Sequence, residues 1–151
     1  MSDIYICLIP RDPEFLPSAA GIAAAEEFMA YLAPDADQIE SEIAPHIKFR
    51  DCGASLESVR CPVCDADILD WWRDLMGDGE HWDEPFVLEP VALPCGHVAP
   101  SLNELRYTWD QGFSRFMLEA MNPAIGPLDE EELKRFEELL GCPLKAIYQH
   151  V

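Results

Sequence analysis

The sequence has few positive charges and no long apolar run, and both shortages narrow the range of possible functions. Only ten of its 151 residues are Lys or Arg, against 29 Asp and Glu, so the formal net charge is −19. A surface of this sign repels the phosphates of nucleic acids and of anionic membranes, and it attracts basic proteins. No apolar stretch approaches the roughly 20 residues that cross a bilayer. We therefore expect no nucleic-acid partner and no membrane partner.

Signals for secretion and for common catalytic chemistry are also missing. The first residues, Met1–Ile4, contain no basic region and no cleavage site, so a cytoplasmic location is expected. The chain has no glycine-rich phosphate loop and no Gly-x-Ser-x-Gly motif. His81 and Glu84 could act as acid and base, but they fall in a polar stretch, where solvated loop charges are the commoner explanation. No catalytic residue is predicted.

The composition is that of a folded domain. Hydrophobic residues make up 49% and aromatic residues 10% of the chain, and disordered chains are poor in both. The length is close to that of one domain, and no repeat, low-complexity tract or linker divides residues 1–151. We therefore predict a single α+β domain with helices packed on a mixed β-sheet.

Hydrophobic periodicity and capping residues predict the individual elements. Strands are predicted near residues 3–9, 47–51, 86–92 and 144–150, with a further short strand at 56–60 and a loop from residue 38 into the second strand. Helices are predicted at residues 18–32, from Asp65 or Asp67 to Gly77, from Trp109 to Met121 and from Asp129 to Leu140. The third of these rests on apolar residues that recur at helical spacing.

Two pairs of potential metal ligands lie about thirty residues apart. The first pair is Cys61 and Cys64, in a Cys-Pro-Val-Cys turn, and the second is Cys95 and His97, around a glycine. A tight turn lets both members of a pair reach one ion, and thiolates with an imidazole are the ligands that zinc prefers. We predict a structural zinc site made of these four residues, with Cys52 as the alternate fourth ligand.

The other cysteines have simpler explanations. Cys7 lies in an apolar stretch and Cys142 follows a helix terminator, so both are assigned to packing. Disulfides are disfavoured because the chain is expected in the reducing cytoplasm and is long enough to build its own core. A set of reduced cysteines without metal remains an alternative to the zinc site.

Four segments of the chain resemble those of a group of small, acidic and mostly uncharacterised bacterial proteins. They are FRDCG at 49–53, VRCPVC at 59–64, SLNELRY at 101–107 and FMLEAMNP at 116–123. The resemblance covers most of the chain but brings no activity with it. Some similar proteins act as immunity proteins beside secreted toxins, so the resemblance favours that function.

Together these features favour a non-enzymatic cytoplasmic binding protein, specifically an immunity protein that inhibits a basic toxin domain. An acidic face would speed association with a cationic target and cover its substrate groove. The densest acidic segments are Asp129–Glu132 and Asp78–Glu84. One alternative is a small zinc-dependent enzyme, which would need an open zinc position near His81 or Glu84. Another is a regulatory adaptor protein.

Overall fold

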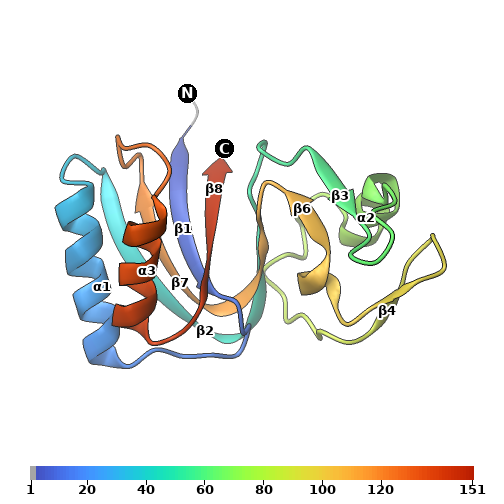
Figure 1. Cartoon of the computed structure of the whole chain (residues 1–151), viewed down its shortest axis with the longest axis horizontal. Coiled ribbons are helices and arrows are strands. Elements are labelled where there is room, and N and C mark those ends of the chain that lie inside the picture. Colours follow the sequence, from blue (N-terminus) through green and yellow to red (C-terminus); the bar gives the residue numbers. More distant parts are fainter. Residues whose placement is uncertain (1–2) are drawn as a thin grey trace.

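Four strands form the main sheet in the computed structural model, which describes residues 3–151 (Figure 1). Their order across the sheet is β2 (Gln38–Arg50), β7 (Gly112–Met121), β1 (Ile4–Pro10) and β8 (Leu144–His150). The neighbouring strands are antiparallel, and one parallel bridge joins Gly53 to the end of β8. With the helices described next, this arrangement confirms the predicted α+β class.

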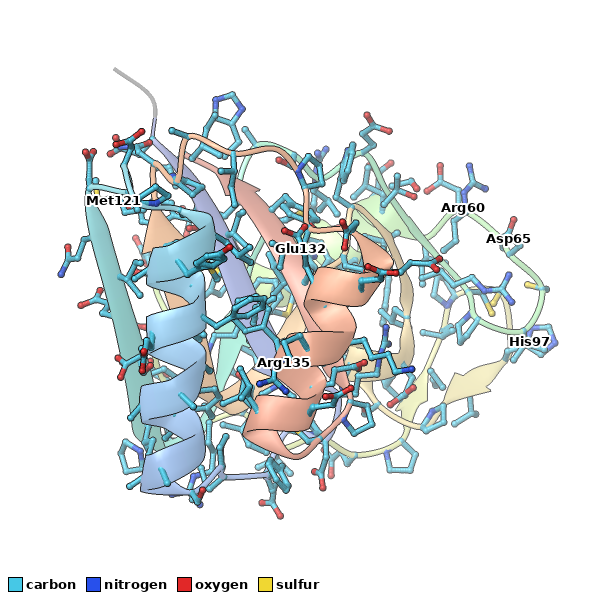
Figure 2. The ribbon with its side chains drawn as sticks, turned by 60° about the vertical axis from the view of Figure 1, so that its left-hand side comes forward. Arg60, Asp65, His97, Met121, Glu132 and Arg135 are labelled. Carbon is cyan, nitrogen blue, oxygen red and sulfur yellow. The ribbon has the colours of Figure 1, made fainter. Side chains whose placement is uncertain are left out.

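Two helices cover one face of this sheet. Figure 2 shows α1 (Ala19–Leu32) and α3 (Glu130–Leu140) side by side in front of the strands. Both begin at the predicted caps: the Ser18 hydroxyl accepts a hydrogen bond from a backbone N–H of α1, and Asp129 and Glu132 form a reciprocal capping box. The main core lies between helices and sheet and includes Ile6, Leu8, Met29, Phe116, Leu118, Phe136, Leu140 and Leu144.

Residues 51–111 form a smaller lobe beside the sheet, here called the small lobe (Figure 1). Its elements are β3 (Ser58–Arg60), α2 (Leu69–Met76), β4 (Val91–Ala92), β5 (Val98–Ala99), the short 3-10 helix η1 (Leu102–Glu104) and β6 (Arg106–Thr108).

The core of the small lobe is joined to the main sheet by aromatic side chains. Phe49 of β2 and Phe113 of β7 pack against each other, with ring centroids 5.0 Å apart. Trp72 of α2 lies 5.8 Å from Phe49 in an edge-to-face arrangement. Because the two long strands contribute to both cores, the small lobe is fastened to the sheet by burial of large apolar side chains.

The predicted helix from Trp109 to Met121 is wrong, because residues 112–121 form the strand β7. This strand lies between β2 and β1, so it is covered on both edges. Phe116, Leu118 and Ala120 are fully buried under the helices, while the residues between them lie on the other face. This alternation was present in the sequence, but Met117 and Met121 also completed a helical stripe, and periodicity alone did not separate the two patterns.

Two other predicted segments differ in the structure. Strand β2 begins at Gln38, where a loop was predicted, and it accommodates Pro45 because it is an edge strand with an irregular register between Ile43 and Lys48. The apolar run Phe86–Leu88 is not a strand; of the predicted strand at 86–92, only Val91–Ala92 pairs, with β5. Phe86 instead packs on Phe113 in the small-lobe core.

None of the helices among residues 3–151 is long and apolar enough to cross a membrane.

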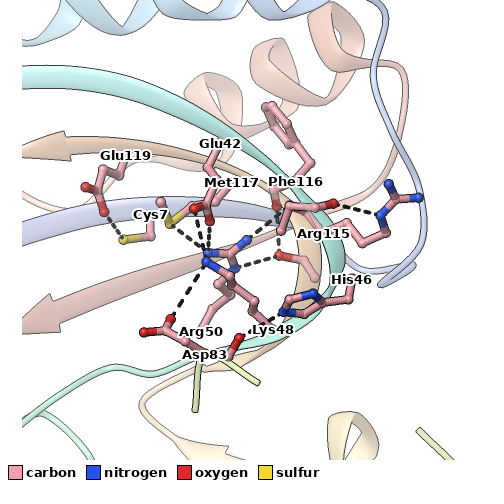
Figure 3. Close-up of polar contacts among 12 residues, drawn as sticks. Cys7, Glu42, His46, Lys48, Arg50, Asp83, Arg115, Phe116, Met117 and Glu119 are labelled. Carbon is pink, nitrogen blue, oxygen red and sulfur yellow. Dashed lines mark hydrogen bonds and ion pairs between the residues drawn. The ribbon is translucent and has the colours of Figure 1, made fainter. Parts of the chain in front are cut away.

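The face of the sheet opposite the helices carries polar and charged groups (Figure 3). Glu119 of β7 is directly opposite Glu40 on β2 and Cys7 on β1, and the Cys7 thiol donates to its carboxylate at 3.6 Å. Burial and the neighbouring Glu40 raise the pKa of Glu119. Glu42 differs: burial opposes its ionisation, but hydrogen bonds from Arg50 and Lys48 lower its pKa.

Replacing Glu119 by glutamine is expected to stabilise the protein at pH 7. The folded-state pKa of Glu119 is raised above its ordinary value of 4.5, so the ionised form disfavours the fold. Stability therefore falls as the pH rises through this pKa, and the variant escapes that loss. The like-charge pair predicts a gain of about 0.2–1 kcal/mol. The gain should disappear in acid, where the Glu119 carboxyl is protonated in both the folded and the unfolded chain. Urea unfolding at several pH values measures it.

Glu42→Gln is the matched control, with the opposite sign. The lowered pKa of Glu42 means that its carboxylate stabilises the fold above its ordinary pKa, and this contribution is lost as the pH falls through the folded-state pKa. Glu42→Gln should therefore destabilise the protein at pH 7 and have little effect in acid. A Glu119→Gln variant that is less stable than the parent at pH 7 would contradict the assigned repulsion.

Candidate metal centre

The first pair of candidate ligands lies on a turn that follows β3. The backbone N–H of Cys61 donates to Ala66 O, and the N–H of Asp65 donates to Cys61 O, both at 3.0 Å. Two further N–H groups, those of Val63 and Cys64, point at the Cys61 sulfur at 3.3 and 3.5 Å. The turn therefore closes around Sγ of Cys61 and brings both thiols to the same side.

The second pair lies at the turn of the β4–β5 hairpin. Leu93 N–H donates to His97 O at 2.8 Å, and Gly96 N–H donates to Leu93 O at 3.0 Å. Gly96 has a φ of +95°, a conformation that side chains with a Cβ rarely adopt. The glycine between Cys95 and His97 is thus required by the turn that presents both side chains.

The structure brings the four predicted ligands together. One ligand atom from each of Cys61, Cys64, Cys95 and His97 lies within 4.8 Å of the other three. Nδ1 of His97 is 3.7 Å from Sγ of Cys95, so this nitrogen faces the sulfurs. Figure 2 places His97 and Asp65 at the end of the small lobe, away from α1 and α3. The cluster could hold one metal ion with all four ligands from the protein, and none of these cysteines is in a disulfide.

The local electrostatics favour a negative charge on the buried Cys61 sulfur. Burial opposes ionisation of Cys61, but the N–H groups of Val63 and Cys64 and the neighbouring thiols lower its pKa to about 6. The pKa of the Cys64 thiol is raised: the Ala66 N–H opposes this, but burial and the adjacent sulfurs outweigh it. Cys61 therefore ionises readily, while Cys64 keeps its proton. A metal ion that bound to Cys64 would displace this proton.

An arginine that the sequence did not single out supports the first turn. Arg106 of β6 donates to Pro62 O at 3.1 Å and to the Asp65 carboxylate at 3.3 Å. Strand β6 pairs with β3, which leads directly into the turn. Arg106 therefore holds the turn from the neighbouring strand, and no spacing in the sequence relates it to Cys61.

The alternate ligand lies elsewhere. Cys52 is fully buried in a separate small cluster with Cys7, Ile9 and Ile147, and its thiol donates to Oε1 of Gln111 at 3.3 Å. Burial raises its pKa to about 11. The fourth member of the metal cluster is therefore His97 and not Cys52. Cys142 is buried in the main core, as the packing assignment predicted.

His81 and Glu84, the acid and base of the enzyme alternative, form an exposed hydrogen-bonded pair. Nδ1 of His81 is 3.0 Å from Oε1 of Glu84, and the two side chains are 74% and 66% exposed. An exposed pair three residues apart on a loop is a common surface feature with little energetic weight.

Comparisons with protein-family models, with curated proteins and with solved structures found no match.

Proposed function

We propose that this chain is a non-enzymatic cytoplasmic binding protein, an immunity protein that inhibits a basic toxin domain through its acidic surface. The observation that carries the proposal is the charge of −19 on a folded chain, about half of it on the small lobe. Residues 51–90 contain eleven Asp and Glu and only two Arg. Such a surface raises the association rate with a cationic target and disfavours anionic ones.

Zinc is the metal that we propose for the cluster. Three thiols and an imidazole form a donor set that suits zinc in a tetrahedral structural site. With four protein ligands no position is left for a reacting water, so the ion would stabilise the small lobe and would take no part in catalysis.

The metal assignment predicts about one zinc per chain in protein purified without added metal. Elemental analysis measures the stoichiometry, and replacement by cobalt gives the absorption bands of tetrahedral thiolate ligation as a second measurement. Protein that folds cooperatively with no bound metal would contradict the assignment.

Both acidic segments that the sequence offers contain carboxylates with partners inside the chain: in Asp78–Glu84, Glu84 contacts His81 and Asp83 lies 3.8 Å from Lys48. In the Asp129–Glu132 run, Asp129 and Glu132 are occupied in the capping box of α3. On the small lobe, Asp70, Asp74 and Asp78 are exposed and spaced four residues apart along α2 and its end. Among the described residues none of these three carboxylates has an ion pair. We assign the binding surface to this row, here called the α2 acidic row.

A hollow beside the α2 acidic row favours the same assignment. Three carboxylates, those of Asp51, Asp74 and Asp78, and the indoles of Trp72 and Trp82 line a cavity of about 780 Å³, against a single cation, Arg73. Acidic groups around aromatic side chains suit the cationic side chain of a basic partner, because a cation is attracted both to carboxylates and to the face of an indole ring.

The function is tested with the protein encoded by the neighbouring reading frame. The proposal expects a secreted protein with a basic C-terminal toxin domain, which this chain binds and inactivates. The toxin domain is expressed with and without this chain, and cell survival, binding and toxin activity are measured. A neighbouring toxin domain that neither binds this chain nor loses activity in its presence would contradict the proposal.

A further inference from the structure

A second cavity, of about 350 Å³, brings together basic residues that are scarce in this chain. It is lined by Arg11, which follows β1, by Arg106 of β6 and by Lys145 of β8, so three of the ten Lys and Arg residues border one space. The elements concerned meet where the small lobe adjoins the sheet (Figure 1). Its lining residues differ from those of the hollow beside the α2 acidic row.

The lysine of this cavity is buried and its charge is unpaired. Lys145 is only 8% exposed, and among residues 3–151 no carboxylate lies within 4.0 Å of its ammonium group. Its one hydrogen bond is to the backbone oxygen of Gln111 at 3.1 Å. An ammonium group has three N–H donors, and buried charges are ordinarily paired. Two donors of Lys145 are thus available to an acceptor.

The surrounding backbone leaves room for that ammonium group. A Cβ at position 112 would lie 3.1 Å from Nζ of Lys145 and 2.6 Å from Oδ1 of Asn103, so any other residue there would displace these two side-chain ends. Burial lowers the pKa of Lys145, and the charge of Asp110 opposes this shift. A bound anion would act in the same direction as Asp110, because it favours the charged ammonium.

The second basic side chain of the cavity without a carboxylate partner among the described residues is that of Arg11, at the edge. Arg11 is exposed, and its guanidinium has no hydrogen bond or ion pair with the described residues. Arg106 differs, because its guanidinium already holds Pro62 and Asp65 of the metal-site turn. Lys145 at the floor and Arg11 at the rim are therefore the groups that can receive an anion.

We propose that this cavity binds the carboxylate of a small molecule, held by Lys145 and Arg11. Two carboxylates, Glu104 and Asp110, also line the cavity, and they limit the negative charge that it accepts. A singly charged carboxylate is therefore favoured over a doubly charged phosphate. The volume lies at the lower end of the range for small-molecule sites, which suits a small metabolite and not a protein segment.

The test uses sodium acetate as the probe on the full-length protein. Acetate replaces chloride at constant ionic strength and pH 7, up to about 100 mM, which detects millimolar binding. Amide shifts of Gly112 and Lys145 are followed by NMR. Saturable shifts centred on these residues are expected, and inorganic phosphate should bind more weakly. Shifts that do not saturate overturn the site, and phosphate binding as tightly as acetate overturns the carboxylate assignment.

Variants separate the site from general salt effects. Arg11→Gln and Lys145→Met should each weaken acetate binding about tenfold or more, because each removes a charge-assisted hydrogen bond. Lys134→Gln, an exposed change of the same charge on α3, should leave binding unchanged. Arg11 is exposed, so its variant keeps the test decisive if Lys145→Met fails to fold. Equal acetate affinity in Arg11→Gln and Lys134→Gln would overturn the assignment of Arg11.

Discussion

Replacing Cys61 by serine is expected to abolish the proposed metal binding and to lower the stability of the protein sharply. Cys61 is fully buried, and it belongs both to the metal cluster and to the core of the small lobe. The binding free energy of a structural metal contributes directly to folding. Loss of a thiolate ligand therefore removes the metal and the stability that the metal provides. We expect a loss of about 4 kcal/mol, equivalent to about 8–16 °C in the melting temperature of a chain of this size.

Cys142→Ser is the matched control for this prediction. Cys142 is also a buried thiol, but it lies in the main core after α3 and outside the metal cluster. Its replacement should lower stability by a smaller amount and leave the metal content unchanged. Metal content is measured by elemental analysis and unfolding by circular dichroism. If Cys61→Ser keeps both the metal and the melting temperature of the parent, the assignment of the cluster is wrong.

The four members of the cluster could be predicted from sequence because each pair is set by local geometry. Cys61 and Cys64 share one turn, and Cys95 and His97 share another, so spacing alone shows that each pair can reach one ion. The chemistry of the ligands then predicts that the two turns meet. The identity of the fourth ligand, His97 or Cys52, could not be predicted in this way. It depends on which distant segment of the chain packs against the turn that carries Cys61 and Cys64.

Elements with their own start and stop signals could also be predicted. Helices α1 and α3 have capping side chains at their first turns, and α3 ends at Gly141 in a left-handed conformation. Strand β7 has no such signals, and its conformation depends on hydrogen bonds to β2 and β1, which lie far away in the sequence. Tertiary pairing therefore decided what the apolar pattern of residues 112–121 left open.

Charge reversal in the α2 acidic row is expected to have a large effect on the rate of association with a partner. Asp74→Lys combined with Asp78→Lys is expected to slow association with the proposed basic partner about tenfold or more. Both side chains are exposed and unpaired among the described residues, so the change should alter folding stability little. Association rates are measured by stopped flow at about 0.15 M and about 1 M salt, where charges are screened beyond roughly 8 and 3 Å.

Glu130→Lys combined with Glu131→Lys is the matched control, because it changes the net charge by the same amount on α3. A general attraction between an acidic protein and a basic one would make the two double variants equally slow. A localised surface predicts that only the α2 variant loses most of its rate, and that it differs little from the parent at high salt. Equal rates for both variants at low salt would show that overall charge, and not the α2 acidic row, guides association. Exposed charges act mainly while the two proteins approach each other. The dissociation rate of the α2 variant should therefore change much less than its association rate.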